Sequence, residues 1–163
     1  CAHNSFISYI EGQFSNVVLD INPEKGHRMI MQTSPCWIWS GTDFFVTSKG
    51  IIGTETTIGG FFLYEKKTPI GYRIRNAMQY GNTLDEYCEM LLDGNSGDYA
   101  NSWLFGDIHT EWNSDDILKS MITTTPPLHL LEEMQDKRSK TIEASKRQKA
   151  KREAKDQKLI EAK

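Results

Sequence analysis

The sequence predicts an α+β protein, with layered antiparallel sheets, flanking helices and a basic helix at the C-terminal end. Three observations support this class. Residues 1–107 contain short β-branched and aromatic runs between turn residues. Two segments with helical spacing follow these runs, and a further strand-like run comes after them. This order, strands then helices then a strand, is typical of a sheet that carries its helices on a face.

The expected strands are short and are separated by turn signals. Arg28–Thr33 alternates polar and apolar residues, as a half-buried strand does. The segments Asn22–Gly26 and Ser48–Gly50 are rich in turn-forming residues. Such spacing favours an antiparallel meander. The strands are predicted at residues 16–21, 28–33, 37–39, 44–47, 51–54, 56–58 and 99–105.

Two helices are predicted between the sixth and seventh of these strands. The segment 69–80 has apolar residues at helical spacing. Thr83 is a candidate N-cap with Glu86 three residues later, which is the capping-box pattern, and Gly94 ends the second helix. The second helix should place four residues on one face: Leu84, Tyr87, Cys88 and Leu91.

The distribution of charge divides the chain. Residues 1–136 hold 8 Lys and Arg against 18 Asp and Glu, which gives −10, and residues 137–163 hold 11 against 4, which gives +7. The sum is the net charge of −3. We therefore predict a domain at 1–107, a polar linker at 108–127 that ends in Pro126-Pro127, and a charged helical tail at 128–163. The tail lacks a regular heptad, so a coiled coil is only weakly supported.

Composition excludes several function classes. No apolar run approaches the roughly 18 residues that cross a membrane. Three cysteines are too few for a disulfide scaffold. The four histidines lack the spacing of metal ligands, and no phosphate-binding glycine loop is present, so we expect neither metal nor cofactor. The basic tail has no aromatic residue to stack on bases, and no nucleic-acid partner is expected.

Cys1 is a candidate nucleophile. An N-terminal thiol can use its own α-amine as the base, because the amine titrates at about 8 and the thiol at about 8.5. The structural alternative is that Cys1 is simply where this chain begins. Neither alternative is favoured by the residues alone.

Three further polar residues have both a functional and a structural interpretation. His3 could orient a substrate or be a core histidine. Asn101 could donate its amide to a developing oxyanion or form a turn. Arg75 could bind a carboxylate or phosphate, or lie exposed on its helix. Asp43 and Glu55 stand among apolar strand residues, where a carboxylate needs partners.

Several motifs, in this order, resemble the phospholipase B-like proteins and the related hydrolases that include penicillin side-chain acyltransferases. They cover residues 2–107, about two thirds of the chain. The resemblance implies an N-terminal-nucleophile hydrolase fold of stacked antiparallel sheets between helix layers. The motifs are AHNSF at 2–6, PCWIWSGTDFF at 35–45, SKGIIGTETTIG at 48–59, RIRNA at 73–77 and NSGDYANSW at 95–103.

The resemblance also implies chemistry. Self-cleavage would expose a cysteine that attacks an amide or ester carbonyl and forms an acyl-enzyme. His3 would lie close to that nucleophile, and Asn101 would hold the oxyanion. The substrate would be a small acyl amide or lipid ester, and the compartment secreted or lysosomal. Residues implied in substrate binding are Phe6, Asp43, Thr57, Arg75 and Trp103.

The family's nucleophile precedes the segment that matches Ala2-His3-Asn4 by a strand and a turn, whereas Cys1 adjoins Ala2 directly. Two hypotheses follow for an enzyme: Cys1 acts in place of that cysteine, or a complementary chain supplies it. A third hypothesis is a truncated, inactive relative that serves as a binding or structural module. Half of a layered domain would expose strand edges and an apolar face, so a second chain or self-association is also expected.

Overall fold

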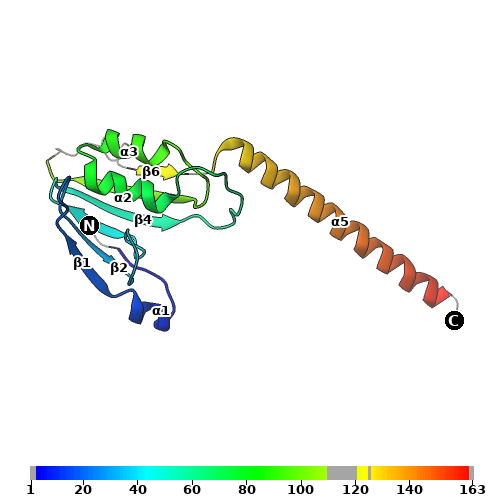
Figure 1. Cartoon of the computed structure of the whole chain (residues 1–163). Coiled ribbons are helices and arrows are strands. Elements are labelled where there is room, and N and C mark those ends of the chain that lie inside the picture. Colours follow the sequence, from blue (N-terminus) through cyan, green and yellow to red (C-terminus); the bar gives the residue numbers. More distant parts are fainter. Residues whose placement is uncertain (1–2, 110–120, 125, 162–163) are drawn as a thin grey trace. The chain divides into compact units, whose positions relative to one another are not determined.

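The structure is a computed structural model that describes residues 3–109, 121–124 and 126–161 (Figure 1). Two compact units are distinguished, Cys1–Pro126 and Pro127–Lys163, and each is described by itself. The first unit confirms the α+β class. It contains α1 (Tyr9–Phe14), β1 (Val17–Ile21), β2 (Met29–Thr33), β3 (Phe44–Thr47), β4 (Ile51–Thr57), α2 (Ile70–Tyr80), α3 (Leu84–Leu92), β5 (Asn101–Asp107) and β6 (Met121–Thr124).

The strands form a six-stranded sheet in the order β1-β2-β3-β4-β5-β6, and every neighbouring pair is antiparallel. The longest pairing joins β4 to β5, from Ile51 opposite Asp107 to Thr57 opposite Asn101. Residues that are paired in this way point to the same face. Glu55, which pairs with Trp103, therefore lies on the face that also carries Phe105.

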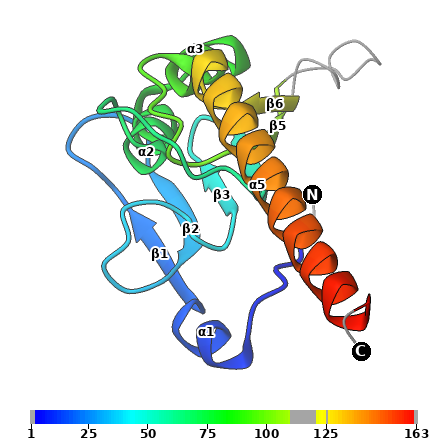
Figure 2. The ribbon, with the colours of Figure 1, turned by 90° about the vertical axis from the view of Figure 1, so that its right-hand side faces the viewer.

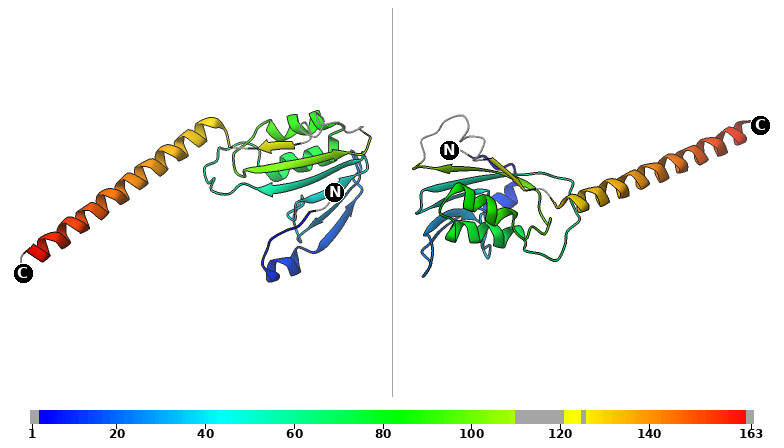
Figure 3. Two further views of the ribbon diagram at one scale, coloured as in Figure 1. Left: turned by 180° about the vertical axis from the view of Figure 1, so that it is seen from behind. Right: turned by 90° about the horizontal axis from the view of Figure 1, so that it is seen from above.

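Helices α2 and α3 cover that face (Figure 3). The ring of Tyr87 on α3 meets Phe105 edge-on at 5.1 Å and stacks against Phe45 at 6.3 Å between centroids. Gly53 allows this packing, because a Cβ there would come within 2.3 Å of the Phe45 ring. The buried core consists of Met29, Met31, Phe45, Ile51, Ile70, Ile74, Ala77, Met78, Tyr87, Leu91, Trp103 and Phe105.

The opposite face keeps large apolar side chains exposed. Val18, Ile30 and Leu104 are 66%, 42% and 45% exposed. The predicted layered sheets therefore correspond, in the described residues, to a single sheet with one layer of helices. An apolar face of this kind is unusual for a protein in water by itself.

The predicted helices form with small differences at their ends. Thr83 caps α3 by accepting a hydrogen bond from the Glu86 amide at 3.2 Å, and the Glu86 carboxylate accepts from the Asn82 amide rather than from Thr83. Tyr87 and Leu91 are fully buried, and Leu84 and Cys88 pack against the same core. The predicted apolar face of α3 is thus confirmed.

Four differences from the sequence expectation concern local structure. Residues 37–39 lie in a loop, with bends at 38 and 39, instead of a strand, and the expected strands 51–54 and 56–58 are one strand, β4. The short helix α1 was not predicted; it lies beside the start of β1 (Figure 2). The segment predicted as a linker contains β6, which pairs with β5.

The second unit contains α5 (Leu128–Glu161), a helix of 34 residues. Ion pairs between successive turns stabilise it, and Lys137 with Glu133 is one of them, at 2.7 Å. Its apolar residues form no continuous stripe. Residues 135–151 of this helix are exposed, whereas Leu130 near its start is buried.

Candidate functional site

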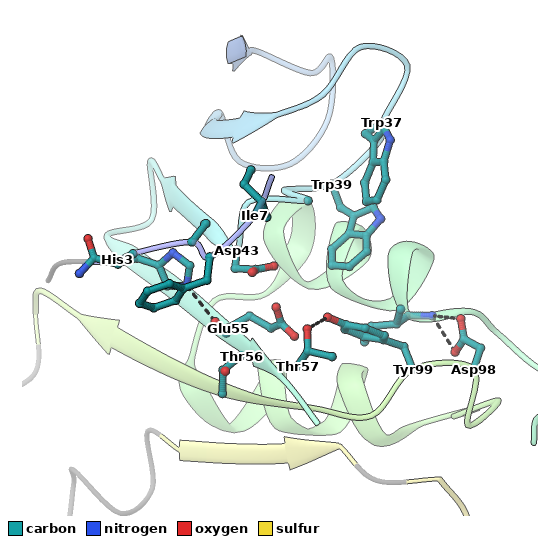
Figure 4. A pocket seen from close by; sticks show the side chains of 15 residues that line it. His3, Ile7, Trp37, Trp39, Asp43, Glu55, Thr56, Thr57, Asp98 and Tyr99 are labelled. Carbon is teal, nitrogen blue, oxygen red and sulfur yellow. Dashed lines mark hydrogen bonds between the residues drawn. The ribbon is translucent and has the colours of Figure 1, made fainter. Parts of the chain in front are cut away.

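A cavity of about 580 Å³ opens at the end of the sheet where β4 finishes (Figure 4). Its volume lies within the range of roughly 300–1,000 Å³ that is usual for small-molecule sites. The N-terminal segment, the loop before β3, the end of β4 and the segment before β5 form its walls. The lining residues are His3, Asn4, Ser5, Phe6, Ile7, Trp37, Trp39, Gly41, Asp43, Glu55, Thr56, Thr57, Ile70, Asp98 and Tyr99.

Two carboxylates lie side by side at the bottom of this cavity. The backbone amide of Glu55 donates to the carbonyl of Asp43 at 3.2 Å, which brings the two residues together across β3 and β4. Asp43 adopts a left-handed backbone conformation with φ of 65°, a region that Asp and Asn tolerate better than other non-glycine residues. Glu55 is only 3% exposed, and neither carboxylate oxygen has a hydrogen bond of ordinary geometry within the described chain.

Burial and mutual repulsion change the titration of this pair. Burial, followed by the neighbouring Asp43 carboxylate, raises the pKa of Glu55 to about 8. Burial likewise raises the pKa of Asp43, while the nearby Glu55 carboxyl group acts in the opposite direction. The Tyr99 hydroxyl and the Asn101 amide are close enough to lower the pKa of Glu55 in part. With a pKa of about 8, Glu55 is therefore mostly protonated at pH 7.

Tyr99 connects the carboxylates to an aromatic wall. Its hydroxyl hydrogen-bonds with the hydroxyl of Thr57, and burial raises its pKa. Its ring meets Trp39 edge-on at 6.2 Å, and Trp39 lies 5.7 Å from Trp37 between centroids. Figure 4 shows these three rings on one side of the cavity, with Glu55 between Tyr99 and Asp43.

His3 comes from the N-terminal segment and lies on the other side. Its Nε2 is 3.0 Å from the carbonyl oxygen of Glu55. A carbonyl oxygen can only accept, so Nε2 carries the proton and donates. This bond fixes the ring against β4 and leaves Nδ1 as the second nitrogen.

The structure brings four of the predicted site residues into the cavity wall, namely His3, Phe6, Asp43 and Thr57. Phe6 is fully exposed. Asn101 is fully buried beside Glu55 and does not line the cavity. Cys1 lies outside the described residues.

Two predicted residues lie elsewhere. Trp103 is buried in the core, where it stacks on Phe105 at 5.6 Å. Arg75 projects from α2 and donates to the carbonyl of Ile38 at 2.9 Å, outside the cavity lining. Neither residue is among those that line the cavity.

Sequence reasoning missed the roles of Tyr99, Trp37 and Trp39 in this wall. Trp37 and Trp39 were assigned to a strand, although Pro35 and the following Cys36, with φ of 68°, begin a turn there. The signal that was available is the aromatic pair itself, since it stands in a stretch without a regular alternation. Nothing in the sequence indicated that Tyr99 meets Glu55.

Neither a metal centre nor a spanning helix is found among the described residues. No three of their His, Cys, Asp and Glu side chains are grouped so as to hold a metal ion. In that same part of the chain, no helix has both the length and the apolar character needed to cross a bilayer.

Comparison with known proteins identifies partial relatives. No family model matches the chain. The protein "Putative phospholipase B-like 2" of Rattus norvegicus is 33% identical over 89 residues, and its counterpart of the same name in Mus musculus is 32% identical over 89 residues. Each alignment covers 50% of this chain and 15% of the relative, so the chain spans a small part of the length of the relatives it matches. Half of this chain is thus similar to phospholipase B-like proteins.

Proposed function

We propose that this chain contributes the pocket of an amide or ester hydrolase or acyltransferase that acts through a cysteine nucleophile and an acyl-enzyme. The observation that carries the proposal is the cavity at the end of β4, where His3, Asp43 and Thr57 from three separate motifs meet around Glu55. The similarity of half the chain to phospholipase B-like proteins supports a hydrolase-type activity. The substrate class proposed is a small acyl amide or a lipid ester.

The reaction would proceed in two balanced steps. The cysteine thiol gives its proton to a base, for which the α-amine of Cys1 is the candidate, and the sulfur attacks the carbonyl carbon. The tetrahedral intermediate collapses, the C–N or C–O bond breaks, and the amine or alcohol leaves with the proton. Water then attacks the thioester, the C–S bond breaks, and the acid leaves as the thiol is restored.

Asn101 and His3 are proposed to assist in different ways. An amide donor that faces the developing oxyanion is worth about 3–4 kcal/mol. Asn101 is buried beside Glu55 and does not line the cavity, so this role requires its amide to turn toward the substrate. His3 donates Nε2–H to the backbone, which leaves Nδ1 to accept from the nucleophile or the leaving group.

The proposal is tested by trapping the acyl-enzyme on the full chain. The protein is incubated with p-nitrophenyl acetate and with an acyl amide, quenched in acid, digested, and analysed by mass spectrometry for a thioester. We expect the acyl group on Cys1 and its absence in Cys1→Ala. Cys36→Ser is the matched control, since Cys36 is an exposed free thiol outside the proposed chemistry.

Acylation of Cys36 in place of Cys1, or equal acylation of all the cysteines, would refute Cys1 as the nucleophile. Absence of any thioester from this chain, together with its appearance after a peptide that carries an upstream cysteine is added, would favour the complementary-chain form. The same mixture analysed by sedimentation would report the association that this form requires.

A second candidate function is a binding module without catalysis. The specific observation that favours it is the bond of His3 to the Glu55 carbonyl, which removes one ring nitrogen from acid–base work. It predicts ligand binding in the cavity with no acylated cysteine under any of the conditions above.

A further inference from the structure

The cavity at the end of β4 has an unusual combination of a charged floor and aromatic walls. Neither carboxylate oxygen of the buried Glu55 has a hydrogen bond of ordinary geometry in the described chain, and Glu55 lies against a second carboxylate, Asp43. Buried carboxylates in a finished fold normally have hydrogen-bonding or ionic partners. An unmet carboxylate that lines a cavity indicates that the cavity receives a group able to meet it.

The charge of the lining restricts what this group can be. No lysine or arginine is among the residues that line the cavity. An anionic or phosphate group would therefore meet the Asp43 and Glu55 carboxyl groups without a lysine or arginine to compensate its charge. A positively charged group is what these carboxyl groups would accept.

The walls distinguish an organic cation from a metal ion. The rings of Trp37, Trp39 and Tyr99 form a continuous aromatic surface that ends at the carboxylates. Aromatic faces attract ammonium groups through the ring quadrupole, and cages of such rings bind alkylated ammonium ions. A metal ion would need further ligands, but no metal-binding group is found in the described residues and His3 already uses Nε2 on a carbonyl.

We infer that the cavity is a binding site for an organic ammonium ion, with Asp43 and Glu55 against the positive charge and Trp39, Trp37 and Tyr99 around its alkyl groups. As a statement about the substrate, namely that it carries a cationic amine near its reacting carbonyl, the inference rests on the function proposed above. As a binding property it is independent of any reaction at a thiol.

The titration of the pair gives the site a pH signature. The titratable groups around Glu55 are Asp43 just before β3, Tyr99 from the segment before β5 and His3 from the N-terminal segment, with Asp98 farther along the wall. An ammonium ion stabilises the ionised form of Glu55 and so lowers its pKa from about 8. Binding at pH 7 therefore releases a proton, and affinity rises as pH increases from 7 to 9.

The test measures binding of tetramethylammonium chloride to the full chain by titration calorimetry and by tryptophan fluorescence. Tert-butanol is the neutral probe of similar shape, and sodium chloride at equal concentration controls for ionic strength. We expect tetramethylammonium to bind at least about tenfold more tightly than tert-butanol. Titrations at pH 7 in two buffers of different ionisation enthalpy should show release of up to one proton per ion bound.

Two variants and one control locate the site. Asp43→Asn keeps the left-handed backbone and removes the charge, and we expect about tenfold weaker binding at every pH. Trp39→Leu should weaken binding about fivefold. Asp20→Asn removes an exposed carboxylate on β1, outside the cavity lining, and should bind as the wild type does. Far-UV circular dichroism of each variant verifies its fold.

Several outcomes would overturn the inference. Tert-butanol binding as tightly as tetramethylammonium would make the cavity merely apolar, and tighter binding of Ca²⁺ or Zn²⁺ would make it a metal site. Wild-type affinity that does not change between pH 7 and pH 9 would remove Glu55 from the site, and this measurement requires no variant. If methylammonium bound more tightly than tetramethylammonium, the carboxylates would still account for cation binding, but the proposed role of the aromatic rings would be wrong.

The failure of this inference can be told apart from failure of the proposed function. Cys1→Ala should bind tetramethylammonium with unchanged affinity while forming no thioester. If the wild type forms a thioester at equal rates from acetylcholine and from its neutral analogue 3,3-dimethylbutyl acetate, the function stands and the inference fails. If tetramethylammonium binds and no cysteine is acylated, the inference stands as a binding property and the function fails.

Discussion

Arg73 and Glu55 are both ionisable residues that are 3% exposed, yet their surroundings differ sharply. The Arg73 guanidinium donates to the carbonyls of Thr68 and Leu91 and to the side chain of Asn95, and Asp98 lies 3.8 Å away. Every part of this cation has an acceptor. Glu55 has none of ordinary geometry for either oxygen within the described chain.

The difference separates a structural charge from one that awaits a ligand. Arg73 joins α2, α3 and the loop before β5, and Asp98 in that loop accepts from the amide of Ile70 at the start of α2. This network determines where Tyr99 and the aromatic wall stand. Glu55 joins nothing comparable and faces the cavity that the network helps to shape. A buried ionisable group whose hydrogen bonds are all made indicates a structural role, whereas one without hydrogen bonds indicates a functional role.

The largest effect should follow from breaking the saturated network. Arg73→Leu would leave two buried carbonyls and the Asn95 side chain without their donor, and Asp98 without its cation. We expect the free energy of unfolding to fall by about 3–5 kcal/mol. Urea unfolding followed by tryptophan fluorescence measures it. Arg75→Leu, on the same helix but half-buried, is the matched control and should cost about 1 kcal/mol. Equal losses in the two variants would contradict the distinction.

Glu55→Gln should raise the free energy of unfolding instead of lowering it, and the size of this effect should depend on pH. The folded-state pKa of about 8 is above the unfolded value of about 4.3, so folding binds a proton over this interval. Stability from this group is complete below pH 4.3 and is lost as pH rises to about 8. At pH 8.5 the variant should therefore be more stable than the wild type, by about 1–3 kcal/mol.

Urea unfolding of both proteins at pH 5, 7 and 8.5 checks this expectation. The difference between them should grow with pH, because only the wild type has a carboxylate to ionise at this position. A difference that is the same at the three pH values would show that Glu55 is not protonated in the folded protein.

The sequence predicted the sheet and α3 because these depend on local patterns. Alternation in Arg28–Thr33 and the Thr83 cap are readable without tertiary structure, and both correspond to observed elements. The capping box Ser8 with Glu11 would have identified α1 by the same rule. Strand β6 was harder, because its polar residues show little apolar alternation and its place is set by pairing with β5.

The candidate site was predictable only in part, because its partners come from distant parts of the chain. Asp43 and Glu55 were noticeable as carboxylates within apolar strands. Their contact depends on the register of β3 and β4, and the approach of Tyr99 depends on the Arg73 network. Trp103 was placed in the site by resemblance, while its position opposite Glu55 on the core face puts its ring against Phe45 and Phe105.

Tyr99→Phe should give a smaller effect than Glu55→Gln. The change removes the hydroxyl that bonds with Thr57 and that lowers the pKa of Glu55. In the wild type, stability stops falling near the folded-state pKa of Glu55, and this pH should be higher in the variant. At pH 7 the variant's free energy of unfolding should be lower by about 1 kcal/mol. Thr57→Val is the control, since it removes the same hydrogen bond but leaves the Tyr99 hydroxyl beside Glu55. An identical pH profile for the two variants would contradict the contact.

The smallest effect on stability should come from removing an exposed ion pair, in contrast to the buried groups above. Arg28 forms an ion pair with Asp20 across β1 and β2, and both side chains are about half exposed. The hydrogen bond from Arg28 holds the pKa of Asp20 below its ordinary value, so its contribution is present at neutral pH and is lost as pH falls through the folded-state pKa. Solvent screening keeps that contribution small. Asp20→Asn should leave the urea midpoint at pH 7 nearly unchanged, and raising the salt concentration should remove what difference there is. If Asp20→Asn destabilised the protein as much as Arg73→Leu, exposure would not explain the different contributions of these charges. The urea midpoint, measured over a range of salt concentrations, provides this comparison.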